Sequence, residues 1–530
     1  MQAPADTAVA EAAPARYALA RPAAAWLRLV LAFVSGGLLA ASFAPLDLWP
    51  LAVLAPAVLM WLWQDATPRE AARLGFWFNF ATFAAGTYWL YISIHGFGNA
   101  PIWLAFFLMF GLVAIMGLYH AALGYAVARW LPASGALRWL VGLPAAWLLI
   151  EWWRGWFLSG FSWLSLGYSQ SDTWLAAFAP LAGVYGISAL VLVCAGALTA
   201  LACGSTRVRI AALVTLIVPW LVGAALHGHS WTRPAGPAVT VAIVQGAIPQ
   251  DEKWQESNRE TTLNLYRSLT EKVLGNQLIV WPESAPADVA NDLIDYINAL
   301  YREARAHGSA IVMGVLRADG NPDQPSSTRY FNSVLALDEH QVSWYDKHHL
   351  VPFAEVFPVP SFVRSWLRLM SLPYSDFTPG AAHQPPLPAA HLQLGTTVCY
   401  EDAYGSSMLS VLPRADALVN VTNDAWFGHS SARHQHFQIA RLRALEAGRY
   451  MVRAANDGIS AVIGPHGEVV ARAPEFKPTV LVSKIVPYSG RTPYAYVGNW
   501  LVVSLATLAL AYAVWVRNDR GRRPARDQSD

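Results

Sequence analysis

The sequence predicts a two-part protein, in which a bundle of membrane-spanning helices is joined to one α/β domain outside the membrane. The first observation is composition: of 530 residues, 55% are hydrophobic, only 14% are charged and 24 are tryptophan. Soluble domains carry about 25% charged residues, so most of this chain belongs in a membrane. The second observation is a change of character near residue 238, after which short apolar runs alternate with polar helical segments and all five lysines occur. That alternation is typical of an α/β domain.

Eight apolar segments are candidates for membrane spans. A helix rises about 1.5 Å per residue, so about 20 apolar residues cross a bilayer. The interval 74–128 has no Asp, Glu, Lys or Arg and is long enough for two crossings with a break at 95–101. The first segment lacks a small-residue cleavage pattern, so we expect a retained helix and not a signal peptide. We expect spans at 26–44, 46–63, twice within 74–128, and at 137–152, 175–203, 210–226 and 496–516.

Arginines predict how these spans run, because Lys and Arg near span ends favour the cytoplasmic side. In an eight-span arrangement every arginine cluster falls on one face, and the alternate loops carry almost no positive charge. The tails 1–25 and 517–530 are therefore expected in the cytoplasm. Residues 26–230 form a seven-helix bundle, 238–488 face outward and 496–516 form the eighth span; in a bacterium the outer domain lies in the periplasm, on the inner membrane. The clusters are Arg16, Arg21 and Arg28; Arg69 and Arg73; Arg129 and Arg138; Arg207 and Arg209; and Arg517, Arg520, Arg522, Arg523 and Arg526.

Charge and cysteine content exclude two further classes of protein. The net charge of +2 and the absence of a basic run in the central region argue against nucleic-acid binding. Of the three cysteines, Cys194 and Cys203 fall inside an apolar stretch, which argues against a disulfide framework.

Three residues at the ends of predicted strands are candidates for chemistry. Cys399 ends the apolar run 394–398, Glu283 follows the run 278–281, and Lys347 follows 342–345. Taken alone, each has an ordinary explanation: a buried free cysteine, a solvated carboxylate and one half of a surface ion pair. Together they are more specific, because open α/β sheets place their ligands at strand ends.

The motifs around these residues resemble the nitrilase superfamily, whose Glu, Lys and Cys occur in this order on three strand ends. They are TrpProGluSer at 281–284, AspLysHisHisLeuValProPheAlaGlu at 346–355 and ThrThrValCysTyrGluAsp at 396–402; the segment 419–428 also resembles the superfamily. Because seven predicted spans precede this domain and one follows it, the resemblance narrows to the apolipoprotein N-acyltransferase family over essentially residues 26–516. The segments 160–170 and 244–254 are further family-typical pieces.

The resemblance implies a four-layer αββα sandwich on the outer membrane face. It also implies transfer of an acyl chain from a phospholipid to the N-terminal amine of a diacylglyceryl-cysteine lipoprotein, the last step of lipoprotein maturation. Two half-reactions through a thioester on Cys399 predict ping-pong kinetics.

The roles of the candidate residues follow from acyl-transfer chemistry. A free cysteine thiol has a pKa of about 8.5, so the nucleophile benefits from a base that removes its proton, and Glu283 is the candidate base. Attack on an ester creates an oxyanion, and Lys347 and the backbone amide of Tyr400 are the candidate donors. We expect Glu355 and Glu401 to hold Lys347 and the incoming amine.

No cofactor and no metal is expected for this chemistry. The adjacent residues His348 and His349 would point to opposite faces of a strand and would not form a metal site.

Five residues are candidates for substrate binding. Trp163 and Trp254 match aromatic positions of the family and are predicted near the lipid entrance, although tryptophans more often form an interfacial belt. Asn332 matches a family position and is expected to orient a loop or the substrate. Phe362 and Trp366 recur at helical spacing beside arginines, which predicts an interfacial helix or lid, or else a helix packed on its own domain.

Two alternative functions remain open from the sequence. A membrane-tethered amidase would use the same residues with water as acceptor, but eight spans are a large anchor for a hydrolase of small amides. Release of ammonia without lysophospholipid would favour the amidase.

A transporter or scaffold would show charge along the spans, and the spans supply little charge beyond Glu151 and Arg154 near a span end. Retained function after Cys399→Ser would favour that class.

Overall fold

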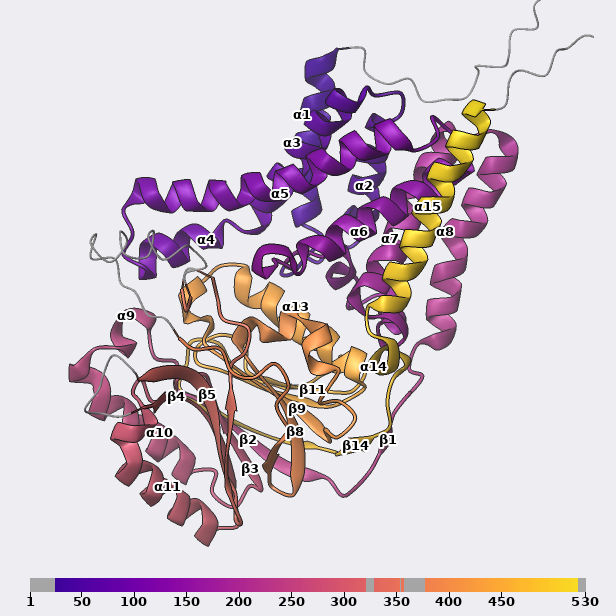
Figure 1. Ribbon diagram of the computed structural model, residues 1–530. Coiled ribbons are helices and arrows are strands. Elements are labelled where there is room, and N and C mark those ends of the chain that lie inside the picture. Colours follow the sequence, from indigo (N-terminus) through magenta and orange to yellow (C-terminus); the bar gives the residue numbers. More distant parts are fainter. Residues whose placement is uncertain (1–23, 321–327, 353, 357–376, 523–530) are drawn as a thin grey trace, which may run out of the picture.

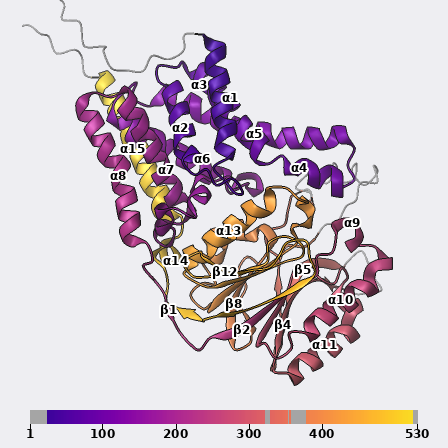
Figure 2. The same cartoon turned by 180° about the vertical axis from the view of Figure 1, so that it is seen from behind.

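The structure has a helical part stacked on an α/β part (Figures 1 and 2). It is a computed structural model that describes residues 24–320, 328–352, 354–356 and 377–522. The first eight α-helices and the C-terminal helix form the helical bundle, and two β-sheets with their covering helices lie at one end of it. The helices of the bundle and its C-terminal connection are α1 Ala25–Ala40, α2 Leu51–Leu62, α3 Pro68–Gly86, α4 Trp89–Tyr91, α5 Ile102–Trp130, α6 Leu143–Arg154, α7 Ala179–Cys203, α8 Thr206–Leu226, α14 Pro493–Val497 and α15 Trp500–Arg522.

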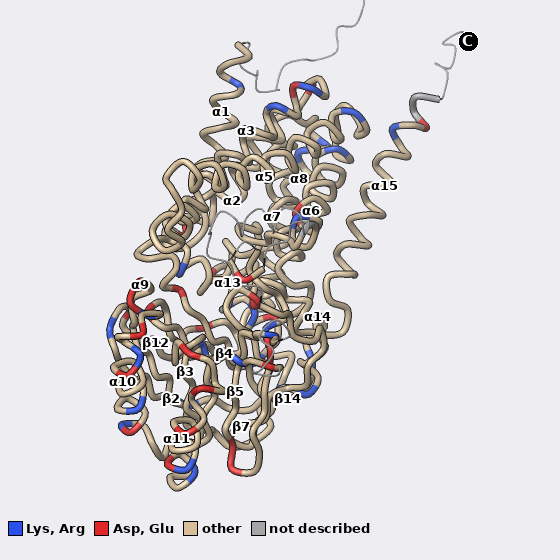
Figure 3. The backbone as a smooth tube through the Cα atoms, turned by 60° about the vertical axis from the view of Figure 1, so that its left-hand side comes forward, with Lys and Arg blue, Asp and Glu red and all other residues tan. Residues whose placement is uncertain are grey.

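Within the described part of the chain, four helices are long and apolar enough to cross a membrane. They are Ile102–Trp130, Trp174–Cys203, Thr206–Leu226 and Trp500–Asp519, while α1 and α2 are apolar but shorter. These four correspond to predicted spans, and the count of eight spans stays a prediction. Figure 3 shows most Lys and Arg of the bundle at the end away from the sheets.

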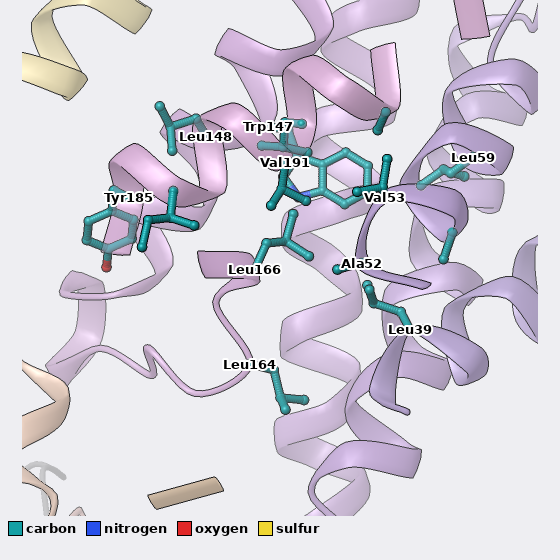
Figure 4. Packing of buried hydrophobic residues seen from close by; sticks show 14 of the residues in the cluster. Leu39, Ala52, Val53, Leu59, Trp147, Leu148, Leu164, Leu166, Tyr185 and Val191 are labelled. Atoms are coloured by element: carbon teal, nitrogen blue, oxygen red, sulfur yellow. The ribbon is translucent and has the colours of Figure 1, made fainter. Parts of the chain in front are cut away.

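The bundle is held together by apolar side chains and by close helix contacts. Leu39, Leu59, Trp147 and Val191 come from four different helices and meet in its core (Figure 4). Helices α3 and α5 approach so closely that a Cβ on Gly75 would lie 2.2 Å from the carbonyl oxygen of His120. Small residues at such crossings allow the tight packing that membrane helices depend on.

The α/β part confirms the α/β fold predicted from the sequence. Its sheets have the strand orders β13-β2-β3-β4-β5-β6 and β12-β11-β10-β9-β8-β7. Valines and leucines of both sheets form one core between them. Helices α10 Arg259–Glu271 and α11 Ile294–Ala306 cover the outer face of the first sheet, and α13 Ala432–Ala447 covers that of the second. The strands are β2 Val239–Gln245, β3 Leu278–Trp281, β4 Ala310–Asp319, β5 Arg329–Leu337, β6 Val342–Asp346, β7 Leu387–Ala389, β8 Leu392–Val398, β9 Ala417–Thr422, β10 Met451–Ala455, β11 Ala461–Ile463, β12 Val469–Arg472 and β13 Thr479–Ile485; β1 Arg233–Pro234 pairs with β14 Tyr488–Ser489 outside the sandwich.

Helix α13 carries many of the contacts that join the two parts. It lies between the second sheet and the bundle (Figure 1), so polar residues on it are buried and find partners across the junction. These contacts fix the distance and orientation of the sheets relative to the membrane helices. They include Gln435 Nε2 to Gly86 O (3.1 Å), Gln438 Nε2 to Asp47 Oδ1 (3.1 Å), Arg441 to both carboxylate oxygens of Asp172 (2.8 and 2.5 Å) and the Val184 amide to Glu446 Oε1 (2.7 Å).

The contact made by Glu446 repairs a break in α7. Gly183 has φ +65° and ψ −171°, so the helix is interrupted there and the amide of Val184 lacks a partner within its own helix. Glu446 accepts that N–H and also pairs with Arg443, which donates to the Tyr168 hydroxyl. A buried ion pair of the α/β part therefore caps a helix of the bundle.

This arrangement predicts that Glu446→Ala destabilises the whole protein. Arg443 would remain buried without its carboxylate, which typically costs about 3–5 kcal/mol of unfolding free energy. The matched control is Asp172→Ala, which removes a more exposed ion pair of the same helix and should cost less than about 1 kcal/mol. Thermal unfolding in detergent measures both variants, and equally small changes in the two midpoints would contradict the prediction.

Candidate active site

Three strands deliver the candidate residues to one place. Glu283 follows β3, Lys347 follows β6 of the same sheet, and Cys399 follows β8 of the second sheet. All three side chains are buried. Glu283 and Lys347 both act electrostatically on the Cys399 thiol, so the candidate site lies where the two sheets meet.

The Lys347 ammonium lies between two carboxylates. Its Nζ is 2.8 Å from Glu355 Oε2 and 3.5 Å from Glu283 Oε1, and the side chain is only 1% exposed. Burial alone would lower the pKa of Lys347, but Glu355 and Glu283 outweigh burial and raise it. The ammonium therefore stays charged at every physiological pH.

Asn332 aligns the two carboxylates with each other. Its Nδ2 donates to Glu283 Oε1 and to Glu355 Oε1, both at 2.7 Å. The backbone carbonyl oxygen of Asn332 accepts the backbone N–H of Lys347 at 2.8 Å. One side chain thus uses both of its N–H groups to hold the groups that surround the ammonium. The structure places Asn332 beside the predicted base, where it orients that base directly.

Two further residues hold Glu283 from the other side. The amide of Asn423 donates to Glu283 Oε2 at 2.9 Å, and Lys253 Nζ donates to the Glu283 carbonyl oxygen at 3.1 Å. Burial lowers the pKa of Lys253 to about 8 against the opposing effects of Glu283 and Asp457. Sequence reasoning missed both residues, although Lys253 precedes Trp254 in the family-typical segment 244–254 and Asn423 lies in 419–428.

Cys399 adopts a strained backbone conformation. Its φ of +53° lies in the left-handed region, which typically costs a non-glycine residue about 1–3 kcal/mol. Burial raises the pKa of the thiol, Glu283 raises it further, and Lys347 lowers it. At neutral pH the sulfur therefore keeps its proton until a base removes it.

Glu401 ties the lysine segment to the nucleophile segment. Its Oε1 accepts the amides of His348 and His349 at 2.8 and 3.0 Å, and its Oε2 accepts the amide of Val398 at 2.8 Å. Glu401 therefore holds the backbone that follows Lys347, through the amides of the next two residues.

Tyr400 contacts the lysine segment through its side chain. The hydroxyl donates to the Leu350 carbonyl at 3.0 Å, and the Lys347 Nζ lies 5.8 Å from the ring centroid. The assignment of its backbone amide as an oxyanion donor stays a prediction.

The expected opposite orientation of His348 and His349 is wrong. Strand β6 ends at Asp346, so strand alternation does not extend to these two residues. Their rings contact each other edge to face, with centroids 4.8 Å apart.

The predicted substrate-binding residues are spread over several places. Trp163 is buried, donates from Nε1 to Gln435 Oε1 at 2.8 Å and packs on His436, so it lies at the junction and not at an open lipid entrance. Trp254 is 49% exposed at the surface of the α/β part. Phe362 and Trp366 lie outside the described residues, so the lid stays a prediction.

Comparison with known proteins gives a consistent result over most of the chain. Residues 35–197 match the apolipoprotein N-acyltransferase N-terminal domain, and residues 240–494 match the carbon-nitrogen hydrolase family. An apolipoprotein N-acyltransferase from Azotobacter vinelandii is 38% identical over 504 residues, which are 94% of this chain and 97% of the relative. Those from Methylococcus capsulatus and Pseudomonas putida are 39% and 38% identical, covering 90% and 92% of this chain and 94% and 97% of the relatives.

The electrostatics of the site predict opposite effects of two substitutions on Cys399. Lys347→Met removes the charge that lowers the thiol pKa, whereas Glu283→Gln removes one that raises it. Alkylation by iodoacetamide requires the thiolate, so its pH midpoint should rise in the first variant and fall in the second, each pKa unit changing the rate at a fixed pH about tenfold. Intact-mass spectrometry against pH measures this.

Cys399→Ala is the control, because it gives the background from Cys194 and Cys203. Midpoints that move in the same direction in both variants would contradict the electrostatic assignment.

Proposed function

The chain belongs to the apolipoprotein N-acyltransferase family, and from this premise we propose how it acts. It transfers a fatty acyl chain from a membrane phospholipid, through a thioester on Cys399, to the N-terminal amine of the S-diacylglyceryl cysteine of apolipoproteins. The observation that carries the proposal is the buried Lys347 ammonium between Glu283 and Glu355, beside Cys399.

In the first half-reaction Glu283 takes the proton of the Cys399 thiol, and the sulfur attacks the ester carbonyl of the phospholipid. Lys347 and the amide of Tyr400 stabilise the oxyanion that forms. When the carbon–oxygen bond breaks, Glu283 returns the proton to the departing alkoxide, so lysophospholipid leaves with a free hydroxyl group and the acyl chain stays on sulfur.

In the second half-reaction the lipoprotein amine attacks the thioester and gives a proton to Glu283. The same donors stabilise the second oxyanion, and the carbon–sulfur bond then breaks. Glu283 returns the proton to the sulfur, which restores the thiol and leaves an amide on the lipoprotein. Both half-reactions need one base and one oxyanion site. A single arrangement of Glu283, Lys347 and Cys399 can therefore serve both the phospholipid and the lipoprotein amine.

We place the protein in the bacterial inner membrane with both termini in the cytoplasm and the α/β domain in the periplasm. The support is the gathering of bundle arginines at the end away from the sheets (Figure 3), since such residues favour the cytoplasmic side. The junction formed by α13 keeps the sheets against the bundle, close to the lipid acyl donor.

The two alternative functions are not favoured. The relatives that cover nearly the whole chain are named as acyltransferases, and the match extends through the membrane part. Neither a hydrolase of small amides nor a binding scaffold explains why the match to acyltransferases includes the membrane part.

A thioester intermediate is the first testable consequence. Incubation with phospholipid alone should add one acyl group to the intact mass of the wild type, hydroxylamine should remove it, and Cys399→Ser should not form this hydroxylamine-sensitive adduct. Lys347→Ala should slow its formation by about 10²–10³-fold, because one oxyanion donor is lost. Ammonia release from small amides, with no acyl adduct and no lysophospholipid, would overturn the proposal.

The orientation has its own test. Green fluorescent protein fused after residue 530 should fluoresce because the tail is cytoplasmic, and alkaline phosphatase fused after residue 228 should be active because that position is periplasmic. The reverse pattern would contradict the orientation while leaving the chemistry untouched.

A further inference from the structure

A cluster of four charged side chains lies buried behind the nucleophile, and the mechanism above does not use it. It consists of Asp402, Asp424, His436 and Arg453, and their side chains are inaccessible to solvent. Arg453 donates to Asp424 Oδ2 at 3.0 Å and to Asp402 Oδ2 at 3.4 Å. Burying four charges is costly unless each is paired, so the cluster needs an explanation.

The geometry favours a proton on both ring nitrogens of His436. Nδ1 is 2.8 Å from Asp424 Oδ1, and Nε2 is 3.1 Å from Asp402 Oδ1. With a carboxylate on either side, only the doubly protonated ring donates to both. In agreement, the two aspartates overcome burial and Arg453 and raise the pKa of His436 to about 9. With the ring charged, the cluster holds two positive and two negative groups.

This ring also contacts the backbone of the nucleophile. Nε2 also lies 3.3 Å from the Cys399 carbonyl oxygen, so its one N–H is shared between that oxygen and Asp402 Oδ1. The same carbonyl accepts Asn420 Nδ2 at 3.0 Å. Asn420 is itself held by Arg453, which donates to Asn420 Oδ1 at 2.6 Å. Two buried donors, each fixed by the cluster, thus hold one carbonyl group.

The position of that carbonyl decides where the next amide points. A trans peptide is planar, and its C=O and N–H point in opposite directions. The carbonyl of Cys399 and the amide of Tyr400 belong to the same peptide group. Holding the oxygen toward the cluster therefore directs the Tyr400 N–H away from it, and the φ of +53° at Cys399 would relax without such a hold.

We propose that His436, as a buried imidazolium, is a positioning residue that aims the Tyr400 amide at the oxyanion by holding the Cys399 carbonyl. The inference rests on the proposed function, since it assigns the aim of an oxyanion donor. His436 touches no reacting atom and acts through the peptide group.

The membrane bundle closes this cluster from the other side. The ring of Trp163 packs on His436 with centroids 5.6 Å apart, and Arg154 Nη1 donates to the Trp163 carbonyl at 2.7 Å. Trp163 thereby covers the imidazolium and keeps water from its hydrogen bonds. The bundle segment that carries Trp163 is thus part of the device that orients the oxyanion donor.

The test uses two double variants that are matched in charge. His436→Gln with Asp402→Asn and His436→Leu with Asp402→Asn both remove one positive and one negative charge, and Gln and Leu are close in size. Asn420 still donates to the Cys399 carbonyl in both variants, but only glutamine replaces the donor that His436 supplies. In the full-length protein, the glutamine variant should form the thioester within about tenfold of the wild-type rate, and the leucine variant should be slower by about 10²-fold or more.

Two measurements separate this role from a general structural one. Alkylation of Cys399 by iodoacetamide needs no oxyanion donor, so both double variants should keep it within about threefold of wild type. Equal thioester rates in the two variants, or alkylation lost as strongly as thioester formation, would overturn the proposal.

Nitrogen NMR of ¹⁵N-histidine-labelled wild type tests the charge of the ring directly. It should show both ring nitrogens of His436 protonated at pH 7, with the signal assigned by its absence in the glutamine variant. A neutral ring would overturn the inference. If wild type forms no thioester while the ring is doubly protonated, the proposed function fails and the state of His436 stands.

Discussion

The neutralisation of one buried ammonium is the constraint on which the site depends. Lys347 is almost inaccessible to solvent, and an ammonium in that setting is tolerated only with close counter-charges. Glu355 supplies the first at 2.8 Å and Glu283 the second at 3.5 Å, and Asn332 prevents the two carboxylates from moving apart. The candidate base and the candidate oxyanion donor are therefore fixed by the same interaction. A change at any of these residues alters all of them.

The second constraint is the burial of α13 on both sides. A helix that covers a sheet normally presents its polar face to water, but here that face meets the bundle. Its two glutamines, Arg441 and Glu446 therefore bond to helices and loops of the bundle, whereas His436 points back toward Cys399. The junction that holds the sheets on the helical bundle is also a wall of the candidate site. The proposed chemistry on a lipid ester would benefit from this, because Cys399 is then held at a fixed distance from the bundle.

The sequence predicted the parts that local motifs encode and missed those that depend on packing. Glu283, Lys347 and Cys399 each follow an apolar run, which marked them as candidates, and the resemblance of their motifs to the nitrilase superfamily predicted that they meet. Trp163 could not be placed in this way, because nothing in its own segment indicates that a helix from residues 432–447 covers it. His436 lies in a helix with polar residues on both faces, and the sequence does not show that both faces are buried. The orientation of His348 and His349 was predicted wrongly because β6 ends at Asp346, three residues before His349.

The strained backbone conformation of Cys399 depends on contacts made by the residues on both sides of it. A residue at positive φ relaxes unless the groups before and after it are held. Glu401 accepts the N–H of Val398, one peptide group before the one that precedes Cys399, and Asn420 and His436 contact the carbonyl of Cys399 itself. With the backbone held on both sides of Cys399, its side chain has little freedom beyond its own rotation. A nucleophile fixed in this way need not rearrange between the two proposed half-reactions, in which a phospholipid gives up the acyl chain and a protein terminus accepts it, so adaptation to the substrate is left to the surfaces around the site.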